Sequence, residues 1–234
     1  MKLNNTRTFT RMDTVIDLID TDCNIIPLLS RFGIPLGFGD KTIGEVCDDN
    51  GLDSGIFLLV INFTMAGVIP ASEKADIHTA VGIVDFLHNS HDYFSSYKFP
   101  HIRTNLINAL DPAHADINPA IIRFFDDYVE HIKGHFDYEE QIVWPYIRGL
   151  QDGTPANYDI GTFRSHHEES GEKLADLKNI IMRYYTTSMP YKMYDALVDI
   201  FNCEEDLDIH RDIENRILIP LIAAIEQSGK HHCP

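Results

Sequence analysis

Two copies of one short pattern constrain the fold of this chain more than any other feature. Residues 135–145 read His-Phe-Asp-Tyr-Glu-Glu-Gln-Ile-Val-Trp-Pro, and residues 210–220 repeat the same His-x3-Glu-x5-Pro spacing 75 residues later. In each copy the histidine and the glutamate are four residues apart, so on a helix their side chains lie on one face. A single His-x3-Glu pair is a weak signal, whereas two copies in register indicate one shared site.

Each pair lies in the middle of an otherwise apolar helix face. The residues of each face recur at steps of three and four, which is typical of a helix packed inside a bundle. The first face comprises Ile121, Phe125, Tyr128, Ile132, His135, Glu139, Ile142 and Tyr146, and the second comprises Ile200, Cys203, Leu207, His210, Glu214, Ile217, Leu221 and Ala224. Because burying an unpaired carboxylate is costly, each glutamate requires a buried cationic side chain or a metal ion as its partner.

A single histidine on an apolar face precedes each pair. His91 precedes His135 by 44 residues, and His167 precedes His210 by 43 residues. Four helices therefore each supply one histidine, and two of them add a glutamate. Six such ligands suit two first-row metal ions better than one. The predicted metal ligands are His91, His135, Glu139, His167, His210 and Glu214.

Other kinds of site agree less well with this pattern. A zinc site needs four ligands and prefers thiolates or three histidines. The sequence contains no H-E-x-x-H motif of a metalloprotease, and no histidine has a glutamate three residues before it, as the ferritin-like di-iron bundles require. Manganese shares the ligand preferences of ferrous iron and stays open. A hydrogen-bonded network of histidines and carboxylates without metal is the remaining alternative.

The periodicity of the chain predicts an all-α protein with two domains. Residues 1–70 form a small helical domain, and residues 76–227 form a four-helix bundle. In the first domain we expect helices over 13–30, with Pro27 kinking or ending this helix, and over 41–50 and 53–69. In the second domain we expect helices over 76–109 with a break at Pro100, 118–150, 159–187 and 190–227. Short loops between the long helices favour antiparallel neighbours, which gives an up-down-up-down bundle.

Charge and cysteine content narrow the possible partners. The chain carries 36 acidic against 19 basic residues, a formal net charge of −17, which argues against nucleic acid and anionic membranes as partners. The most apolar segment, residues 56–69, is shorter than the roughly 20 residues that span a bilayer. The polar N-terminus predicts no secretory signal.

Cys23, Cys47, Cys203 and Cys233 show no C-x-x-C spacing. They therefore favour reduced thiols and a cytoplasmic location.

The His…His-x3-Glu…His…His-x3-Glu pattern over residues 76–227 resembles the haemerythrin-like (HHE) cation-binding domain, a four-helix bundle with a non-haem di-iron centre. This resemblance implies that His91, His135, His167 and His210 are terminal iron ligands, and that Glu139 and Glu214 bridge two irons that share an oxo or hydroxo oxygen. Oxygen-carrying haemerythrins have a fifth histidine four residues after the second-helix histidine, and here that position is Glu139.

The first domain resembles the N-terminal domain of the di-iron iron–sulfur cluster repair proteins. Residues 31–53 carry Arg-Phe-Gly-Ile, then Gly-Asp-Lys-Thr-Ile-Gly-Glu-Val-Cys, then Gly-Leu-Asp in that family's order. This resemblance implies repair of clusters damaged by nitric oxide or oxidants, with iron–sulfur proteins as clients and nitric oxide or dioxygen as small ligands; it leaves a homodimer open. The family has adjacent cysteines in the turn where this chain has Gly37 and Phe38, which puts a thiol-dependent step in doubt.

Two other functions remain open from the sequence. A haemerythrin-like protein could bind or sense dioxygen or nitric oxide without turnover, or it could reduce nitric oxide or peroxide at the metal centre. Stoichiometric iron loss to a client, reversible ligand binding and multiple turnovers distinguish the three functions.

Overall fold

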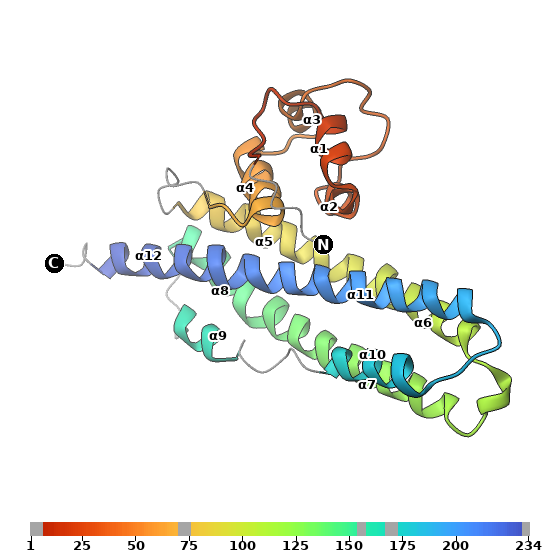
Figure 1. Ribbon diagram of the computed structural model, residues 1–234. Coiled ribbons are helices and arrows are strands. Elements are labelled where there is room, and N and C mark those ends of the chain that lie inside the picture. The colour runs from red at the N-terminus through yellow and green to blue at the C-terminus, as the bar shows by residue number, and fades with distance from the viewer. Residues whose placement is uncertain (1–6, 70–75, 154–157, 167–172, 231–234) are drawn as a thin grey trace. The chain divides into compact units, whose positions relative to one another are not determined.

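The computed structural model describes residues 7–69, 76–153, 158–166 and 173–230. Within these residues every regular element is a helix, and the one pairing of extended backbone is an isolated bridge between Thr14 and Thr42 (Figure 1). The all-α prediction is therefore confirmed. Among the described helices, none has both the length and the apolar character needed to cross a membrane.

The chain folds into two compact units that share its long helices. The first unit comprises residues 1–90, 147–155 and 212–234, and the second comprises residues 91–146 and 156–211. Three of the four boundaries, those after residues 90, 146 and 211, fall inside helices. The sequence-based division into 1–70 and 76–227 stays a prediction.

The first unit begins with four helices: α1 (Val15–Thr21), α2 (Ile26–Arg31), α3 (Ile43–Asp49) and α4 (Ser54–Ala66). Thr42 and Glu45 form a capping box that begins α3, since each side chain accepts a hydrogen bond from the backbone N–H of the other. Asp53 begins α4 in the same way, because its carboxylate accepts from the N–H groups of Gly55 and Ile56. Helices α5 (Ile77–Asp92), α8 (Trp144–Gln151) and α12 (Ile219–Lys230) contribute the rest of this unit.

The helix predicted over residues 13–30 is divided in the structure. Asp22 has an extended backbone, and its carboxylate accepts from the N–H of Asn24, so it ends α1 and begins a short 3-10 turn. Pro27 lies in the first turn of α2. A backbone N–H at this position has no intrahelical acceptor, so the proline costs the helix no hydrogen bond. The break therefore lies at the capping aspartate, and the kink or end predicted at Pro27 is wrong.

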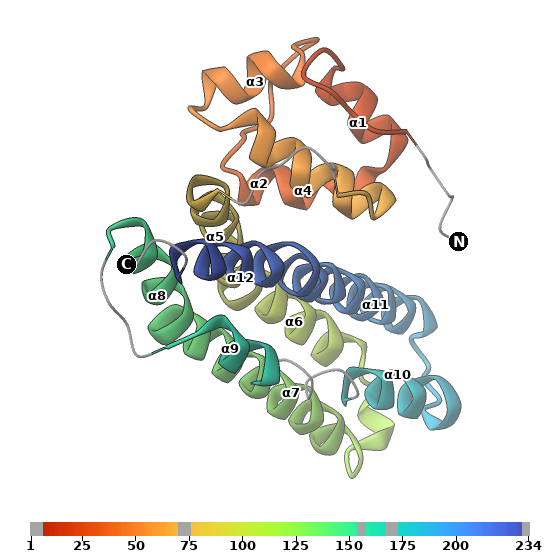
Figure 2. The same cartoon turned by 90° about the vertical axis from the view of Figure 1, so that its left-hand side faces the viewer.

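Four helices enclose the core of the second unit: α6 (Phe99–Ala109), α7 (Asn118–Tyr138), α10 (Lys173–Tyr184) and α11 (Pro190–Ile213). Helix α7 contacts both α6 and α10. The short connections 110–117 and 185–189 reverse the chain between consecutive helices (Figures 1 and 2). The third predicted helix, 159–187, is described as α9 (Ile160–His166) and α10; residues 167–172 lie outside the described ranges.

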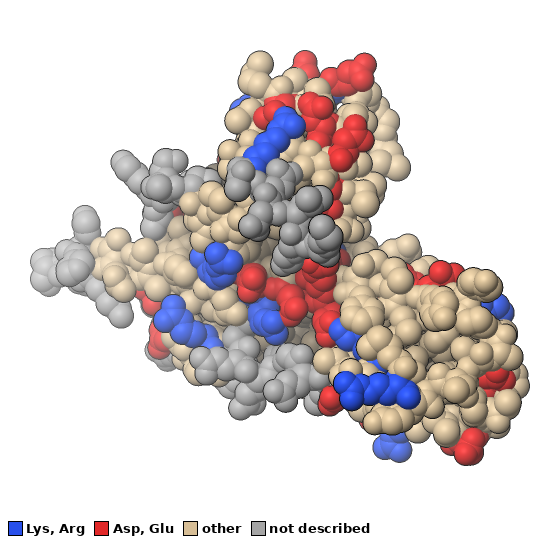
Figure 3. Space-filling model, in the orientation of Figure 1, with Lys and Arg blue, Asp and Glu red and all other residues tan. Residues whose placement is uncertain are grey.

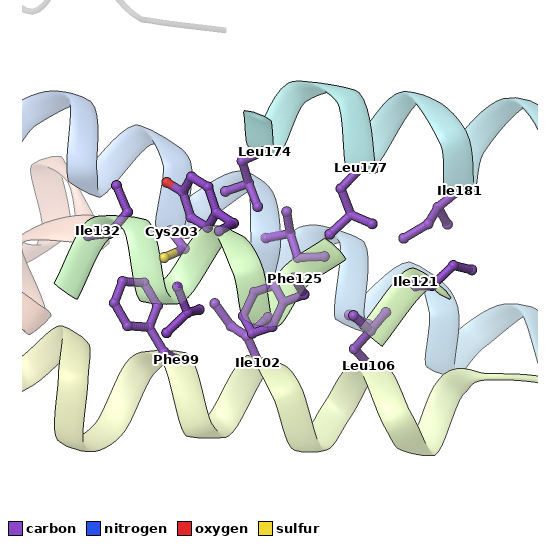
Figure 4. Close-up of a cluster of buried hydrophobic side chains, with 14 of the residues drawn as sticks. Phe99, Ile102, Leu106, Ile121, Phe125, Ile132, Leu174, Leu177, Ile181 and Cys203 are labelled. Carbon is purple, nitrogen blue, oxygen red and sulfur yellow. The ribbon is translucent and has the colours of Figure 1, made fainter. Parts of the chain in front are cut away.

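The core between these helices is almost wholly aliphatic and aromatic (Figure 4). Its labelled members are Phe99, Ile102 and Leu106 of α6, Ile121, Phe125 and Ile132 of α7, Leu174, Leu177 and Ile181 of α10, and Cys203 of α11. Tyr128 is buried in the same cluster, and burial raises the pKa of its hydroxyl. The inward face predicted for α7 from Ile121 to Ile132 is confirmed.

Three π-helical stretches interrupt the long helices: Tyr93–Lys98, Glu139–Val143 and Glu214–Leu218. In each case the following residue donates its N–H to the carbonyl five residues earlier, as Trp144 does to Glu139. Each is also followed by a proline at the next position but one: Pro100, Pro145 and Pro220. Because proline lacks an N–H and collides with the carbonyl four residues before it, the wider π turn lets the helix continue through it. The break predicted at Pro100 is therefore wrong.

The π turn in the middle of the bundle also changes which residues face inward. Ile142, predicted on the inward face, is 43% exposed, whereas Val143 is fully buried. A π turn holds one more residue than an α turn, so every side chain beyond Glu139 is rotated relative to an unbroken 3.6-residue period. The glutamate itself begins the stretch and keeps its inward position.

Candidate metal centre

Four buried residues bring their ligand atoms to one place. One nitrogen or carboxylate oxygen from each of His91, Glu139, His210 and Glu214 lies within 4.8 Å of the other three. The two histidines are 5% and 4% exposed, and both glutamates are fully buried. All four were predicted as ligands from the sequence.

Glu139 places its carboxylate between two histidines. Its Oε2 lies 3.0 Å from Nε2 of His91, and its Oε1 lies 2.9 Å from Nε2 of His135. The second contact joins residues one turn apart on the same helix, as the four-residue spacing predicts. The first joins the end of α5 to the end of α7. Two imidazole nitrogens thus face the two oxygens of one carboxylate, which is the arrangement expected of a carboxylate shared by two metal ions.

Glu140 contacts the other nitrogen of His91. Its Oε1 lies 2.7 Å from Nδ1 of His91, within hydrogen-bonding distance. An ionised carboxylate can only accept, so Nδ1 donates a proton to Glu140, and Nε2 is the nitrogen that faces Glu139. A carboxylate oxygen and an imidazole nitrogen 3.0 Å apart share a positive charge, either the proton of an imidazolium or a metal ion.

Aromatic rings enclose the histidines. Phe136 stacks on the ring of His91 with centroids 4.0 Å apart, and its centroid lies 5.6 Å from that of His210. Phe94 meets His210 edge-on at 6.0 Å, and Trp144 lies nearly parallel to His91 at 5.9 Å. These rings fix the orientation of both imidazoles. They also keep water from the carboxylates, which strengthens electrostatic interactions at the site.

The other predicted ligands are placed only in part. His135 joins the group through Glu139 and has a 17% exposed side chain. His167 lies outside the described residues. The complete set of six ligands therefore stays a prediction. Glu140 was missed by the sequence analysis, because a residue next to a ligand points about 100° away around a helix and the spacing gives no signal for it.

The donor set fits a metal ion. Two buried carboxylates in one place repel each other and are strongly destabilised unless a positive charge lies between them. The donors are imidazole nitrogens and carboxylate oxygens, and the described cluster includes no cysteine, which suits iron or manganese better than a structural zinc site.

The comparisons with known proteins agree with this geometry. The sequence model described as "Hemerythrin HHE cation binding domain" matches residues 82–222, which is more than half of the chain. A comparison with curated proteins gave no match. A comparison with solved structures gave none either. The matched region contains both His-x3-Glu pairs and the buried His/Glu group, and the chain belongs to the haemerythrin HHE cation-binding domain family.

Proposed function

We propose that this haemerythrin-like protein holds two non-haem iron ions and acts in the repair of iron–sulfur clusters damaged by nitric oxide or oxidants. The observation that carries the proposal is the carboxylate of Glu139, whose two oxygens face Nε2 of His91 and Nε2 of His135. His91, His135 and Glu139 would hold the metal ions together with His167, His210 and Glu214. The bound ions would supply redox chemistry and sites for small ligands.

The protein's own side chains prepare this site. Glu140 fixes the tautomer of His91, so that Nε2 is available as a ligand. Phe136 and Trp144 hold the plane of that imidazole by stacking on it. The π turn that begins at Glu139 keeps its carboxylate inward while the helix continues through Pro145.

The resemblance of residues 31–53 to the cluster repair proteins supports the choice of function. Thiol chemistry in this segment has little support, since the turn carries Gly37 and Phe38 where the family has adjacent cysteines. Cys47 is buried, and burial raises the pKa of its thiol to about 11, which leaves it protonated near neutral pH. We therefore assign the repair step to the metal centre, in a cytoplasmic protein with reduced thiols.

Transfer of iron to a damaged client tests this proposal. The iron-loaded, reduced protein is mixed without oxygen, in the presence of a thiol reductant, with an iron–sulfur protein whose cluster has lost iron to an oxidant, and cluster absorbance and iron content are followed in both proteins. We expect recovery of the client in proportion to the iron lost. Glu214→Ala, which removes a buried carboxylate of the centre, should give no recovery. Equal recovery with this variant or with the same amount of free ferrous iron would contradict the repair function.

The aromatic enclosure favours a second candidate, the binding of a diatomic gas without turnover. Phe94, Phe136 and Trp144 surround the histidines with apolar surface, and an apolar pocket retains a small uncharged ligand. The reduced protein is exposed to dioxygen, the gas is removed, and the visible spectrum is followed. Full return of the reduced spectrum over several cycles supports this candidate, whereas lasting oxidation supports repair.

A further inference from the structure

We propose that α11 is a homodimer interface, in which its exposed face packs antiparallel against the same face of a second copy of the chain. This inference is independent of the proposed function, because it rests on a surface without metal ligands. The α11 row, as we call it, comprises Tyr191, Tyr194, Val198, Phe201, Glu205 and Asp208.

The first four members of the row are large apolar or aromatic residues that face solvent. Tyr191 is 81% exposed, Tyr194 60%, Val198 56% and Phe201 43%. They follow one another at steps of three, four and three, so they share one face of the helix. Single exposed apolar residues are common, but a continuous row of four marks an interaction surface.

The inner face of α11 is already occupied by the protein's own core. Met193, Ala196, Ile200 and Cys203 point inward and are all buried in the cluster of the second unit. The helix is therefore apolar on two faces, of which its own chain covers one. A helix of this kind packs between two partners. Its own unit leaves the second face uncovered.

The last two members of the row are acidic, and both are exposed. The whole row keeps the three-four spacing of a coiled-coil seam from Tyr191 to Asp208. When two such rows pair antiparallel about a twofold axis between Val198 and Phe201, Val198 of each copy faces Phe201 of the other. Tyr194 then faces Glu205, and Tyr191 faces Asp208. Each tyrosine hydroxyl can donate to the carboxylate opposite it.

A parallel pairing of the same rows is much less favourable. It would place Glu205 against Glu205 and Asp208 against Asp208 in the seam, and like charges brought together in this way repel. It would also place Tyr191 against Tyr191 and Tyr194 against Tyr194 of the other copy, so no hydroxyl would have a carboxylate opposite it. The row is thus complementary to itself in the antiparallel sense, as a twofold interface requires.

Neighbouring residues hold the centre of the row in place. The ammonium group of Lys178 lies 4.1 Å from the ring centroid of Phe201 and is paired with the carboxylate of Glu204. The rings of Tyr191 and Tyr194 contact each other edge-on at 6.5 Å. In the space-filling view the surface over this part of the molecule is largely uncharged (Figure 3). Side chains that are already ordered lose little entropy on docking.

The expected association is moderate and dependent on salt. Seventeen steps of 1.5 Å give the row a length of about 26 Å, so the contact is confined to one helix from each copy. The chain carries a net charge of −17, so two copies repel each other at long range. Because salt screens this repulsion while leaving the apolar contact intact, dimerisation should strengthen as ionic strength rises.

Sedimentation velocity of the full chain at several concentrations tests the interface. We expect a monomer–dimer equilibrium in the wild type, and at least a tenfold weaker association for Val198→Glu. The matched control is Ile107→Glu, which places the same charge at a residue of α6 that is 44% exposed. Circular dichroism and metal content verify that both variants fold. A wild type that stays monomeric at all concentrations, or equal weakening by both variants, would overturn the proposal.

Disulfide trapping tests the direction of the pairing. In a Cys23→Ser, Cys233→Ser background, Tyr194→Cys and Glu205→Cys are combined in one chain and oxidised. The two new thiols are about 16 Å apart on their own helix, too far for a bond within one chain. We expect covalent dimers from the double variant and few from Tyr194→Cys alone. Efficient crosslinking by Tyr194→Cys alone would show a different pairing and overturn the antiparallel register.

Discussion

Glu140 and His91 are joined by a contact of 2.7 Å between Oε1 and Nδ1, although 49 residues separate them in the chain. This contact determines which nitrogen of His91 faces the buried carboxylate of Glu139. It also distinguishes two adjacent glutamates: Glu139 lies in the buried His/Glu group, whereas Glu140 contacts a histidine of that group. The second copy of the pattern has Asn215 at the position of Glu140, so its helix carries no such carboxylate.

Replacing Glu140 should weaken metal binding while the protein stays folded. Loss of a carboxylate partner of a ligating histidine typically lowers metal affinity by roughly 10–100-fold. We expect a loss of this size for Glu140→Ala in competition with a chelator, and a smaller loss for Glu140→Gln, whose amide oxygen still accepts. Asn215→Ala is the matched control and should bind metal as the wild type does. Equal affinities for Glu140→Ala and Asn215→Ala would show that the contact does not orient the ligand.

Metal binding should be visible in the fluorescence of Trp144, the one tryptophan in the sequence. Its ring is 2% exposed and lies 5.9 Å from that of His91. We expect a blue-shifted emission in the metal-free protein and strong quenching when ferrous or cobaltous ions are added, because these ions quench at short range. His91→Ala should remove the saturable quenching. His101→Ala replaces a histidine whose side chain is 42% exposed, and this variant should keep the quenching. Loss of the quenching in both variants would show that it does not report on metal at His91.

Asp111 should make the fold sensitive to acid. Its carboxylate accepts hydrogen bonds from the hydroxyl and the N–H of Ser188 and from the N–H of Ala113, which lower its pKa to about 2. A folded-state pKa below the usual 3.8 contributes stability that is present above pH 4 and is lost as the pH falls toward 2. We expect metal-free Asp111→Asn to unfold at a lower urea concentration than the wild type at pH 5. The difference between the two midpoints should shrink below pH 4 and vanish as the pH approaches 2, and a constant difference would contradict this account.

The described cysteines should differ in reactivity. Cys23 is exposed, whereas Cys47 and Cys203 are buried. Burial raises the pKa of Cys47 to about 11, so its thiolate is scarce at neutral pH. In a Cys233→Ser background, we expect one thiol to react rapidly with a disulfide reagent in the folded protein, and none after Cys23→Ser. Rapid labelling of Cys47 would reopen a thiol-dependent role for the first unit.

Much of this fold could be predicted from spacing alone. The four-residue separation of histidine and glutamate is a helical turn, and it placed His135 against Glu139 correctly. The apolar period likewise identified Phe125, Tyr128 and Cys203 as buried. These predictions succeed because a bundle helix repeats one geometric relationship along its length, which a sequence displays directly.

The remaining features depend on contacts between distant residues or on local departures from the helical period. Glu140 meets His91 across 49 residues of chain, and no spacing within one helix reveals that contact. Ile142 is exposed beside a π turn, whereas Ile217, at the same position of the second copy and beside the same kind of turn, is buried. A proline follows each π turn and is the sequence signal for it. At Pro100 that proline predicted a break, whereas the helix continues through it.

Metal analysis of protein loaded without oxygen tests the central claim most directly. His91, Glu139, His210 and Glu214 already converge, and His135 contacts the same carboxylate, so the site has donors for more than one ion. We predict two iron ions per chain after expression with sufficient iron, and loss of both in Glu139→Ala. Two manganese ions would retain the site and change its chemistry. One zinc ion per chain, or no metal after iron-replete expression, would contradict the account.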